Sequence, residues 1–346
     1  MRIAIDAMGG DYAPEEIVKG VVKSAQELTD DTFVLAGDEK KITRILGASP
    51  PSNIDIFHTD QFVTMTDPPN VVMKTKKKAS MRIAAQLVKD GQCDAILSAG
   101  NTGALLETSL FTIGRIRGIK RPGLGVFLPT SKRHVLLIDA GANADCRAEH
   151  ILQFAQMGSI YLEHAMGIQR PRVGLLNIGE EPGKGNVFYR EVYEQLAELS
   201  DINFVGNLEP RAMMHGYVDV AVADGFTGNL VLKSSEAAAE FMMSVLREEI
   251  KKSVVARMAA LTLKPLFRNM RRRLDQSEIG GALLLGLKGI LVKCHGRANA
   301  QAIYSAIKMV LRAHHHKVQE FLVKMAQKVG EQPLPKQRTQ IEKLSI

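Results

Sequence analysis

The chain has 346 residues, 45% of them hydrophobic, which is enough for one large α/β domain or two coupled lobes. It has no Trp and only 5% aromatic residues, which argues against a nucleic-acid surface built on aromatic stacking. The three cysteines, Cys93, Cys146 and Cys294, form no CxxC pair. We find neither a secretory signal nor a stretch near the ~20 apolar residues of a membrane span. These features predict a reduced, cytosolic protein.

The net charge of +8 comes from one segment. Residues 250–274 contain eight basic residues and no acidic one, so the rest of the chain is balanced. A local basic segment indicates a docking surface rather than a general polyanion binder, and we expect no nucleic-acid partner. Within 253–274, apolar and basic residues recur on different helix faces. Such a helix can lie on an anionic membrane, or it can pack on a neighbouring helix or a second subunit, and both interpretations are kept.

Apolar runs alternate with helical patterns along most of the chain, which is typical of βαβ units around a mainly parallel sheet. The predicted strands are 3–7, 33–36, 54–57, 95–98, 123–128, 135–140, 173–178, 202–205, 218–223 and 290–293. The predicted helices are 14–28, 80–89, 102–116, 148–165, 187–199, 229–252 and 298–328. A short polar turn separates runs 123–128 and 135–140, which predicts a hairpin.

We expect one α/β catalytic domain over residues 1–329. The regular alternation of apolar runs and helical patterns ends after residue 224. Residues 230–278 are predicted to form a helical insertion that contacts a second subunit or a membrane. Residues 330–346 are polar, contain two prolines and are predicted to be a loose tail.

Four predicted strands end in turns rich in Gly and Asn, and a helical pattern follows each turn. Backbone N–H groups at a helix start attract an anion, and Gly lets the backbone approach a ligand closely. Ligands of open α/β sheets bind beyond the carboxyl ends of strands. The four turns together predict one shared anion site, although each alone is equally compatible with ordinary turn chemistry. The turns are 100–103, 141–143, 179–186 and 225–229.

Several familiar catalytic patterns are absent from the sequence. There is no GxxxxGK[ST] loop, no GxGxxG fingerprint after a strand and no GxSxG elbow. The consecutive histidines 314–316 would point in different directions on a helix, so we expect no metal ion there. Asp139, Asp145 and Asp224 could bind a metal, but structural roles fit these carboxylates equally well.

What remains is a set of amides with one lysine and one histidine: Asn101, Asn143, Asn186, Asn229, Lys184 and His295. Such a set is poor in nucleophiles and suits the positioning of two substrates and the stabilisation of an oxyanion. His295 would act as an acid–base group or a phosphate contact, with a structural histidine as the alternative.

At these residues the chain resembles the phosphate acyltransferase family of bacterial phospholipid synthesis, the acyl-ACP:phosphate acyltransferases. The matching segments follow the family's order over about residues 1–310. They are 6–11, 98–104, 139–143, 177–181, 184–186, 224–229 and 280–296. There are two departures. Residues 74–81 carry lysines and a single Ser where the family usually has an Arg and a Ser pair, and Ala212 stands where the family usually has Asp.

The resemblance implies a three-layer α/β/α fold similar to the phosphotransacetylase and isocitrate dehydrogenase group, with a protruding helical segment. It implies a cytoplasmic homodimer, peripherally associated with an anionic membrane surface, that needs no cofactor and no metal. The implied reaction moves a long acyl chain from acyl carrier protein to inorganic phosphate. The acyl phosphate product would feed a glycerol-3-phosphate acyltransferase of the membrane.

The resemblance also implies roles for individual residues. The catalytic residues would be Lys184, Asn229 and His295. Phosphate would be bound by Gly100, Asn101, Thr102, Gly103, Asp139, Asn143, Asn186, Asp224, Gly225 and Gly228. Carrier protein or membrane would be contacted by Lys74, Lys76, Lys77, Arg211, Leu263, Phe267, Arg268, Arg271 and Arg272. Phosphate would attack the thioester directly, without a covalent enzyme intermediate.

Three other interpretations stay open from the residues alone. The first is a dehydrogenase of similar fold that uses a nicotinamide cofactor, although the dinucleotide fingerprint is missing. The second is a basic scaffold that binds membranes or nucleic acid. The third is a phosphotransacetylase that acts on acyl-CoA, because the residues do not distinguish this donor from a carrier protein.

Overall fold

The computed structural model describes residues 1–274 and 280–331. Its strands are β1 (Arg2–Asp6), β2 (Thr32–Gly37), β3 (Ile54–His58), β4 (Ala95–Ser98), β5 (Gly123–Leu128), β6 (Val135–Ile138), β7 (Arg172–Leu176), β8 (Asn203–Leu208), β9 (Val220–Val222), β10 (Ala282–Leu285) and β11 (Ile290–Lys293). They form one eleven-stranded sheet in the order β3-β2-β1-β4-β11-β10-β5-β6-β9-β7-β8.

The sheet has two parallel halves that run in opposite directions. β10 is antiparallel to both of its neighbours, and β5 and β6 form the predicted antiparallel hairpin. All other ladders are parallel. The carboxyl ends of β1, β4 and β11 therefore lie at one edge of the sheet, and those of β6, β7 and β9 at the opposite edge. The mainly parallel sheet is confirmed, and the direction reverses at the predicted hairpin, because the two antiparallel ladders of β10 leave β11 and β5 parallel to each other.

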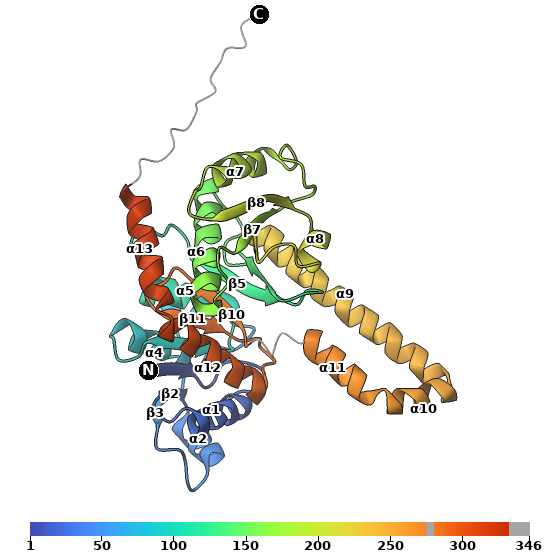
Figure 1. Ribbon diagram of the computed structural model, residues 1–346. Coiled ribbons are helices and arrows are strands. Elements are labelled where there is room, and N and C mark those ends of the chain that lie inside the picture. The colour runs from blue at the N-terminus through green and yellow to red at the C-terminus, as the bar shows by residue number, and fades with distance from the viewer. Residues whose placement is uncertain (275–279, 332–346) are drawn as a thin grey trace, which may run out of the picture.

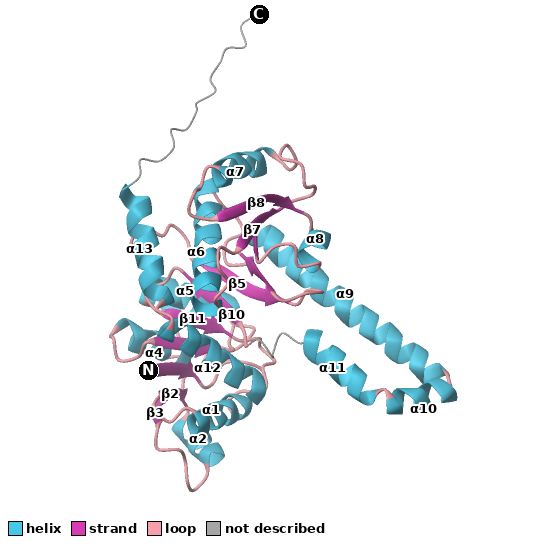
Figure 2. Cartoon of the chain, in the orientation of Figure 1, coloured by secondary structure: helices cyan, strands magenta, loops and turns pink. Residues whose placement is uncertain are grey.

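Helices cover both faces of the sheet. They are α1 (Glu15–Glu27), α2 (Glu39–Leu46), α3 (Val71–Lys74), α4 (Ser80–Lys89), α5 (Thr102–Thr112), α6 (Ala148–Met166), α7 (Val187–Ala197), α8 (Pro210–Met214), α9 (Gly225–Lys252), α10 (Val254–Thr262), α11 (Lys264–Leu274), α12 (Ala300–His315) and α13 (Val318–Glu331). One apolar cluster packs α1, α2, α6, α7, α12 and α13 on the first face. A second packs α3, α4, α5, α8 and the start of α9 on the other (Figure 2). The three-layer α/β/α fold is thus confirmed.

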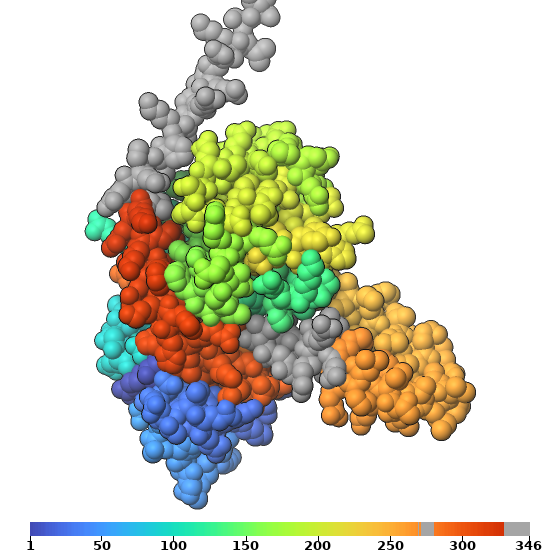
Figure 3. Space-filling model, in the orientation of Figure 1, coloured from blue at the N-terminus to red at the C-terminus, as the bar shows by residue number. Residues whose placement is uncertain are grey.

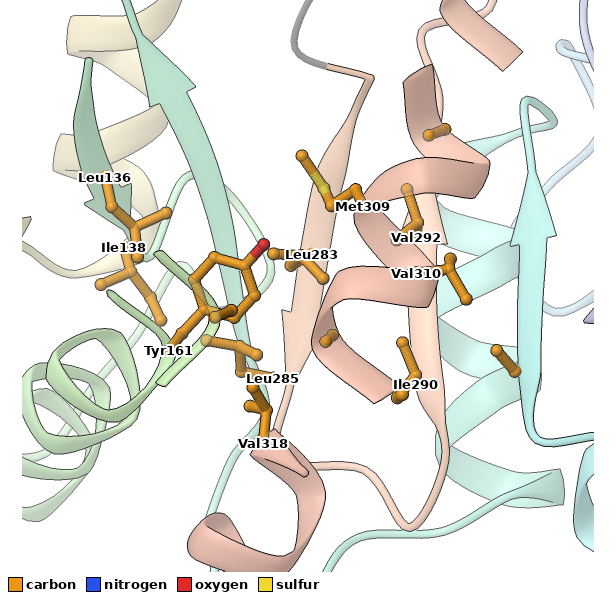
Figure 4. Packing of buried hydrophobic residues seen from close by; sticks show 14 of the residues in the cluster. Leu136, Ile138, Tyr161, Leu283, Leu285, Ile290, Val292, Met309, Val310 and Val318 are labelled. Atoms are coloured by element: carbon orange, nitrogen blue, oxygen red, sulfur yellow. The ribbon is translucent and has the colours of Figure 1, made fainter. Parts of the chain in front are cut away.

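The strands are nearly continuous apolar runs because both of their faces are buried. Along β11, Ile290 and Val292 belong to the first cluster and Leu291 to the second, as the alternation of side chains in a strand requires. Figure 4 shows Leu283 of β10 between Tyr161 of α6 and Met309 of α12. The late strands β10 and β11 thus lie at the centre of the core.

Helices α9, α10 and α11 form an arm that projects from the body (Figures 1 and 3). Of the 28 residues of α9 only Gly225, Gly228 and Leu232 are buried, and α10 buries none. Pro265 is the second residue of α11, within the first turn of a helix, where proline is tolerated. Among the residues described, no helix is long and apolar enough to cross a membrane.

Three differences from the predicted elements have physical causes. The final helix is broken into α12 and α13 by Lys317, whose φ of 54° is left-handed, and a lysine gives no sequence signal for such a break. β10 is hidden in a Gly-rich run, in which a Cβ on Gly281 would lie 2.6 Å from the Lys293 carbonyl oxygen. The short helices α2, α3 and α8 have too few turns for their apolar residues to show a clear helical period in the sequence. The predicted tail over 330–346 lies, from residue 332 onward, outside the described residues.

Candidate active site

The strand directions separate the four Gly/Asn turns. The turn at 100–103 lies at the edge formed by the ends of β1, β4 and β11, here called the β4 edge. The other three lie at the edge formed by the ends of β6, β7 and β9, here called the β6 edge. The two edges are separated by the length of a strand, about 13 Å for four residues, and α9 runs from one toward the other, so a single site shared by all four turns stays a prediction. Three turns meet, and the fourth lies across the sheet.

At the β6 edge the buried carboxylate of Asp139 organises its own turn. Its Oδ1 accepts hydrogen bonds from the N–H groups of Leu124 (3.0 Å), Gly141 (3.2 Å) and Ala142 (3.0 Å). Its Oδ2 accepts from the backbone N and the Nδ2 of Asn143 at 2.7 and 2.8 Å. Burial raises the pKa of Asp139, and these donors oppose that rise. Asp139 and Asn143 are therefore occupied in shaping the turn.

Asp224 holds the start of α9. Its Oδ1 accepts from the N–H of Thr227 at 2.9 Å, which is an N-cap bond, and its Oδ2 accepts from the hydroxyl groups of Thr227 and Tyr189. The next residue, Gly225, donates its N–H to the Asn143 carbonyl at 2.8 Å. Through these bonds α9 begins in direct contact with the turn that follows β6.

The contact between α9 and this turn requires glycine at position 228. A Cβ there would lie 1.9 Å from the carbonyl oxygen of Asp139, well inside van der Waals contact. A Cβ on Gly141 would meet Asn229 at 3.3 Å, so the Asn229 side chain lies directly over this turn. The predicted residues Gly225, Gly228 and Asn229 are thus brought together with Asp139 and Asn143.

Lys184 lies on an exposed loop at the same edge. Its side chain is 49% exposed and its Nζ is 3.9 Å from Glu181. Two buried side-chain amides, those of Asn177 and Asn207, form hydrogen bonds with the backbone of this loop. Neither residue was among the predicted site residues. Asn177 donates to the Lys184 carbonyl at 3.1 Å, and Asn207 donates to the Glu181 carbonyl at 2.7 Å. For Asn177, the signal available in the sequence was its position directly after the apolar strand β7.

The β4 edge is built around a second buried carboxylate. Asp6 accepts from the hydroxyl groups of Ser80 (2.6 Å) and Ser98 (2.7 Å), and Ser98 Oγ accepts from the N–H of Gly100 (3.0 Å). Burial raises the pKa of Asp6. A Cβ on Gly9 would lie 2.4 Å from Asp6 Oδ2, so only glycine fits beside this carboxylate.

Asn101 caps α5 rather than offering a free amide. Its Oδ1 accepts from the N–H of Ala104 at 3.0 Å, and its Nδ2 donates to the carbonyls of Met65 and Asp67 at 3.0 and 3.1 Å. Asn186 caps α7 in the same way, accepting from the N–H of Tyr189 at 2.9 Å. At the β4 edge, the donors that point beyond the strand ends are therefore the first-turn N–H groups of α5, on Thr102 and Gly103.

His295 follows β11 and is exposed at the β4 edge. Its Nδ1 accepts from the N–H of Arg297 at 3.1 Å, so the neutral ring carries its proton on Nε2. Burial, together with the charges of Lys293 and Lys233, lowers the pKa of His295. Neutral His295 thus presents an N–H donor at this edge at neutral pH.

Helix α9 connects the two edges. It begins at the β6 edge, but the positive charge of its residue Lys233 acts to lower the pKa of both His295 and Lys293 at the β4 edge. Asn229 precedes Lys233 by four residues and therefore lies on the same helix face, about 6 Å away. Of the predicted catalytic residues, Asn229 and His295 lie along this path, and Lys184 stays at the β6 edge.

None of the cysteines is prepared to act as a nucleophile. Burial raises the pKa of Cys294 to about 12, that of Cys146 to about 12 and that of Cys93 to about 11. A thiol must ionise to attack, so all three are inert at neutral pH. Within residues 1–274 and 280–331, no group of three His, Cys, Asp or Glu side chains could hold a metal ion.

The predicted docking residues do not form one patch. Lys74 and Lys77 are exposed near the β4 edge, and Lys76 is paired with Asp67 at 2.5 Å. Arg211 is exposed on α8, which follows the edge strand β8 at the other end of the sheet. On the arm, Leu263 and Arg268 are exposed and Phe267 is partly buried. The side chains of Arg271 and Arg272 lie outside what the structure describes.

The fold is that of the phosphotransacetylases. A phosphotransacetylase from Streptococcus pyogenes aligns with a TM-score of 0.60 at 15% identity, over 92% of this chain and 94% of its own. A branched-chain phosphotransacylase from Enterococcus faecalis V583 aligns at 0.55 and 16%, over 91% and 99%. A 4-hydroxythreonine-4-phosphate dehydrogenase from Klebsiella pneumoniae aligns at 0.52 and 16%, over 90% and 97%, so the fold alone does not decide between transferase and dehydrogenase.

Sequence comparison decides this question. Residues 1–320 match a family model described as "Fatty acid synthesis protein". A phosphate acyltransferase from Geobacillus sp. (strain WCH70) is 46% identical over 309 residues, which cover 89% of this chain and 93% of the relative. A phosphate acyltransferase from Bacillus cereus (strain G9842) matches to the same extent. The chain belongs to this family of phosphate acyltransferases and is an acyltransferase.

Proposed function

We propose that this protein transfers a long-chain fatty acyl group from acyl carrier protein to inorganic phosphate and releases acyl phosphate. The observation that carries the proposal is the 46% identity to phosphate acyltransferases over 89% of the chain. The β4 edge also supports this proposal, because its residues provide hydrogen-bond donors and positive charges that suit a phosphate rather than an enzyme nucleophile that would take up the acyl group. The product is an activated acyl group, which a glycerol-3-phosphate acyltransferase would consume in phospholipid synthesis.

The geometry supports direct attack by phosphate. The first-turn N–H groups of α5 on Thr102 and Gly103 hold the phosphate, and one of its oxygens attacks the thioester carbonyl carbon. A C–O bond forms, the tetrahedral intermediate collapses, and the C–S bond breaks to release the carrier's thiolate. The Nε2–H of neutral His295 is proposed to donate a hydrogen bond to the sulfur as negative charge develops on it, and the released thiolate takes its proton from water. Asn229, one helical turn before Lys233, is proposed to donate to the oxyanion.

Carrier docking is proposed for the side of the molecule next to the β4 edge. Acyl carrier protein is acidic, and the exposed ammonium groups of Lys74 and Lys77 lie near the turn that Asn101 caps. Arg211 is at the other end of the sheet and would meet a different part of any partner. Docking by these lysines predicts donor binding that weakens with salt.

The arm is proposed to give both a dimer contact and a membrane contact. Phe241 and Met242 of α9 are 69% and 70% exposed, and we propose that they pack on a second copy in a homodimer. Val255 and Leu261 of α10 are 77% and 72% exposed and lie close in sequence to the basic residue Arg257. A cationic segment with exposed apolar side chains suits peripheral binding to anionic lipid.

The test is acyl transfer by the purified protein. Palmitoyl carrier protein and inorganic phosphate are incubated with it, and acyl phosphate is trapped with hydroxylamine. We expect phosphate-dependent loss of thioester and formation of the hydroxamate. Palmitoyl-CoA as the donor, in a parallel reaction, separates carrier protein from CoA. Phosphate-independent loss of thioester, or an acylated protein detected by mass spectrometry, would contradict direct transfer to phosphate.

Lys184→Ala decides whether the β6 edge takes part in the transfer. If the ammonium stabilises the transition state, turnover should fall by about 10²-fold or more. Folding is checked by the thermal midpoint, since the exposed Lys184 side chain contributes little to the core. Turnover equal to that of the unaltered protein would remove Lys184 from the catalytic residues and leave the chemistry to the β4 edge.

A further inference from the structure

Lys293 is a cation at the β4 edge that the sequence analysis did not select. It is the last residue of β11, and it pairs with Ser98 of β4 and Ala282 of β10. Residues paired in a ladder point to the same face, so Lys293 lies beside the Ser98 side chain on the face covered by α4, α5 and α9. Ser98 in turn accepts from the N–H of Gly100, where the chain turns into α5.

The ammonium of Lys293 has few partners for its position. It is partly buried, and within the described part of the chain it donates one hydrogen bond, to the Cys294 carbonyl at 2.6 Å. Among residues 1–274 and 280–331, no carboxylate forms an ion pair with it. Burial lowers the pKa of Lys293, and the nearby charge of Lys233 acts in the same direction, while Cys294 and Asp11 oppose the shift. A poorly solvated amine with two spare donors is stabilised by an anion close to it.

The neighbours of Lys293 add to the positive potential at this place. Lys233 of α9 influences both Lys293 and His295, and its own carboxylate partner, Glu236, is 2.7 Å away. Helix α5 is eleven residues long and begins directly after Asn101, with three residues between it and the end of β4. Its N-terminus carries a partial positive charge. Two independent sources of positive potential therefore meet at the ends of β4 and β11.

We propose that Lys293 is a catalytic residue that binds the phosphate nucleophile directly, together with the first-turn N–H groups of α5. The inference rests on the proposed acyl transfer to phosphate and adds a residue to it. Lys293 stays protonated throughout the reaction, because the bond that forms is phosphate oxygen to acyl carbon and the bond that breaks is acyl carbon to sulfur. Its charge offsets the repulsion between phosphate and the developing oxyanion.

The experiment compares three variants of the full chain. Lys293→Met removes the charge, and Lys293→Gln removes the charge but keeps a donor for the Cys294 carbonyl. Lys288→Met is the matched control, since Lys288 is exposed in the loop before β11, at the opposite end of the same strand. Inorganic phosphate is titrated by ³¹P NMR, and its KM is measured in the acyl-transfer assay.

We expect both Lys293 variants to weaken phosphate binding and to raise the KM for phosphate by about 10- to 100-fold, as loss of a charged hydrogen bond predicts. The KM for palmitoyl carrier protein should stay within about twofold, since loss of one phosphate contact leaves the donor's binding surface intact. Lys288→Met should match the unaltered protein in both measurements.

The outcomes separate the inference from the proposed function. If the unaltered protein binds phosphate but transfers no acyl group, and the Lys293 variants lose that binding, the function is wrong and the anion site stands. If folded Lys293→Met and Lys293→Gln both bind phosphate as the unaltered protein does, the role of Lys293 is overturned. Absence of phosphate binding by the unaltered protein at millimolar concentration would overturn it as well.

Discussion

At the scale of single residues, buried carboxylates hold the loops around the site. Asp6 organises the β4 edge through Ser80 and Ser98, and Asp139 organises the β6 edge through five hydrogen bonds. Their burial costs free energy that the donors around them offset. The loops at both edges therefore depend on acidic groups whose carboxylate oxygens accept hydrogen bonds from within the protein.

Asp139→Ala should destabilise the protein by at least about 3 kcal/mol, because it leaves several buried N–H groups without an acceptor. Urea unfolding measures this difference. Asp145→Ala is the control, since Asp145 is exposed in the same loop and its loss should change stability by less than about 0.5 kcal/mol. Equal midpoints for the two variants would show that the carboxylate of Asp139 is dispensable.

The residue scale also shows where sequence reasoning stops. The positions of Asn101, Asn143 and Asn186 in turns were predictable from the Gly/Asn patterns, but their amides form hydrogen bonds with other groups of the protein, in helix caps and between loops. A pattern identifies a residue that suits a turn, and only coordinates show which partners use its amide. Lys293 was hidden for a related reason, because an apolar strand that ends in lysine looks like an ordinary strand end.

At the scale of elements, α9 is the part on which the site and the arm both depend. Its first turn rests against the Asp139 turn, its third turn carries Lys233, whose charge acts on His295, and the remainder leaves the body (Figure 1). A shift at its start would move Asn229 and Lys233 together. The long helix was predictable from its period, but its start at Gly225 depends on the Asp224 cap.

Gly228→Ala tests this contact. The added methyl would lie 1.9 Å from the Asp139 carbonyl, so α9 must move, and we expect a loss of about 1–3 kcal/mol together with reduced turnover. Gly183→Ala is the control for stability, because a Cβ there meets nothing within 4 Å. Unchanged thermal unfolding of Gly228→Ala would mean that α9 accommodates the methyl without moving.

The arm has its own test. Val255→Glu with Leu261→Glu places two charges among the exposed apolar side chains of α10, and we expect loss of sedimentation with phosphatidylglycerol vesicles. Val205→Glu, on the exposed part of β8, should leave vesicle binding intact. Light scattering on the same samples reports the oligomeric state. Retained vesicle binding with loss of the dimer would assign the α10 face to the second subunit.

At the scale of the whole molecule, the sheet is a junction of two halves. The alternation of apolar and helical segments predicts the strands, the helices and the three layers, because both faces of the sheet must be covered. The reversal of direction between the halves follows from the predicted β5–β6 hairpin, which divides the four turns between two edges. What could not be predicted is how the halves are joined, since this depends on β10 pairing with β5 across more than 150 residues of chain.

The place of β10 and β11 in the sheet also has a consequence for synthesis on the ribosome. They are the strands that join β4 to β5, yet they are translated after the whole arm. A nascent chain that ends at residue 274 has made β1 to β9 but has no ladder between its two halves, and β4 and β5 are exposed edges. Until the last strands emerge, such a chain offers unpaired edges to other chains, so this is the stage at which a holding chaperone would matter most.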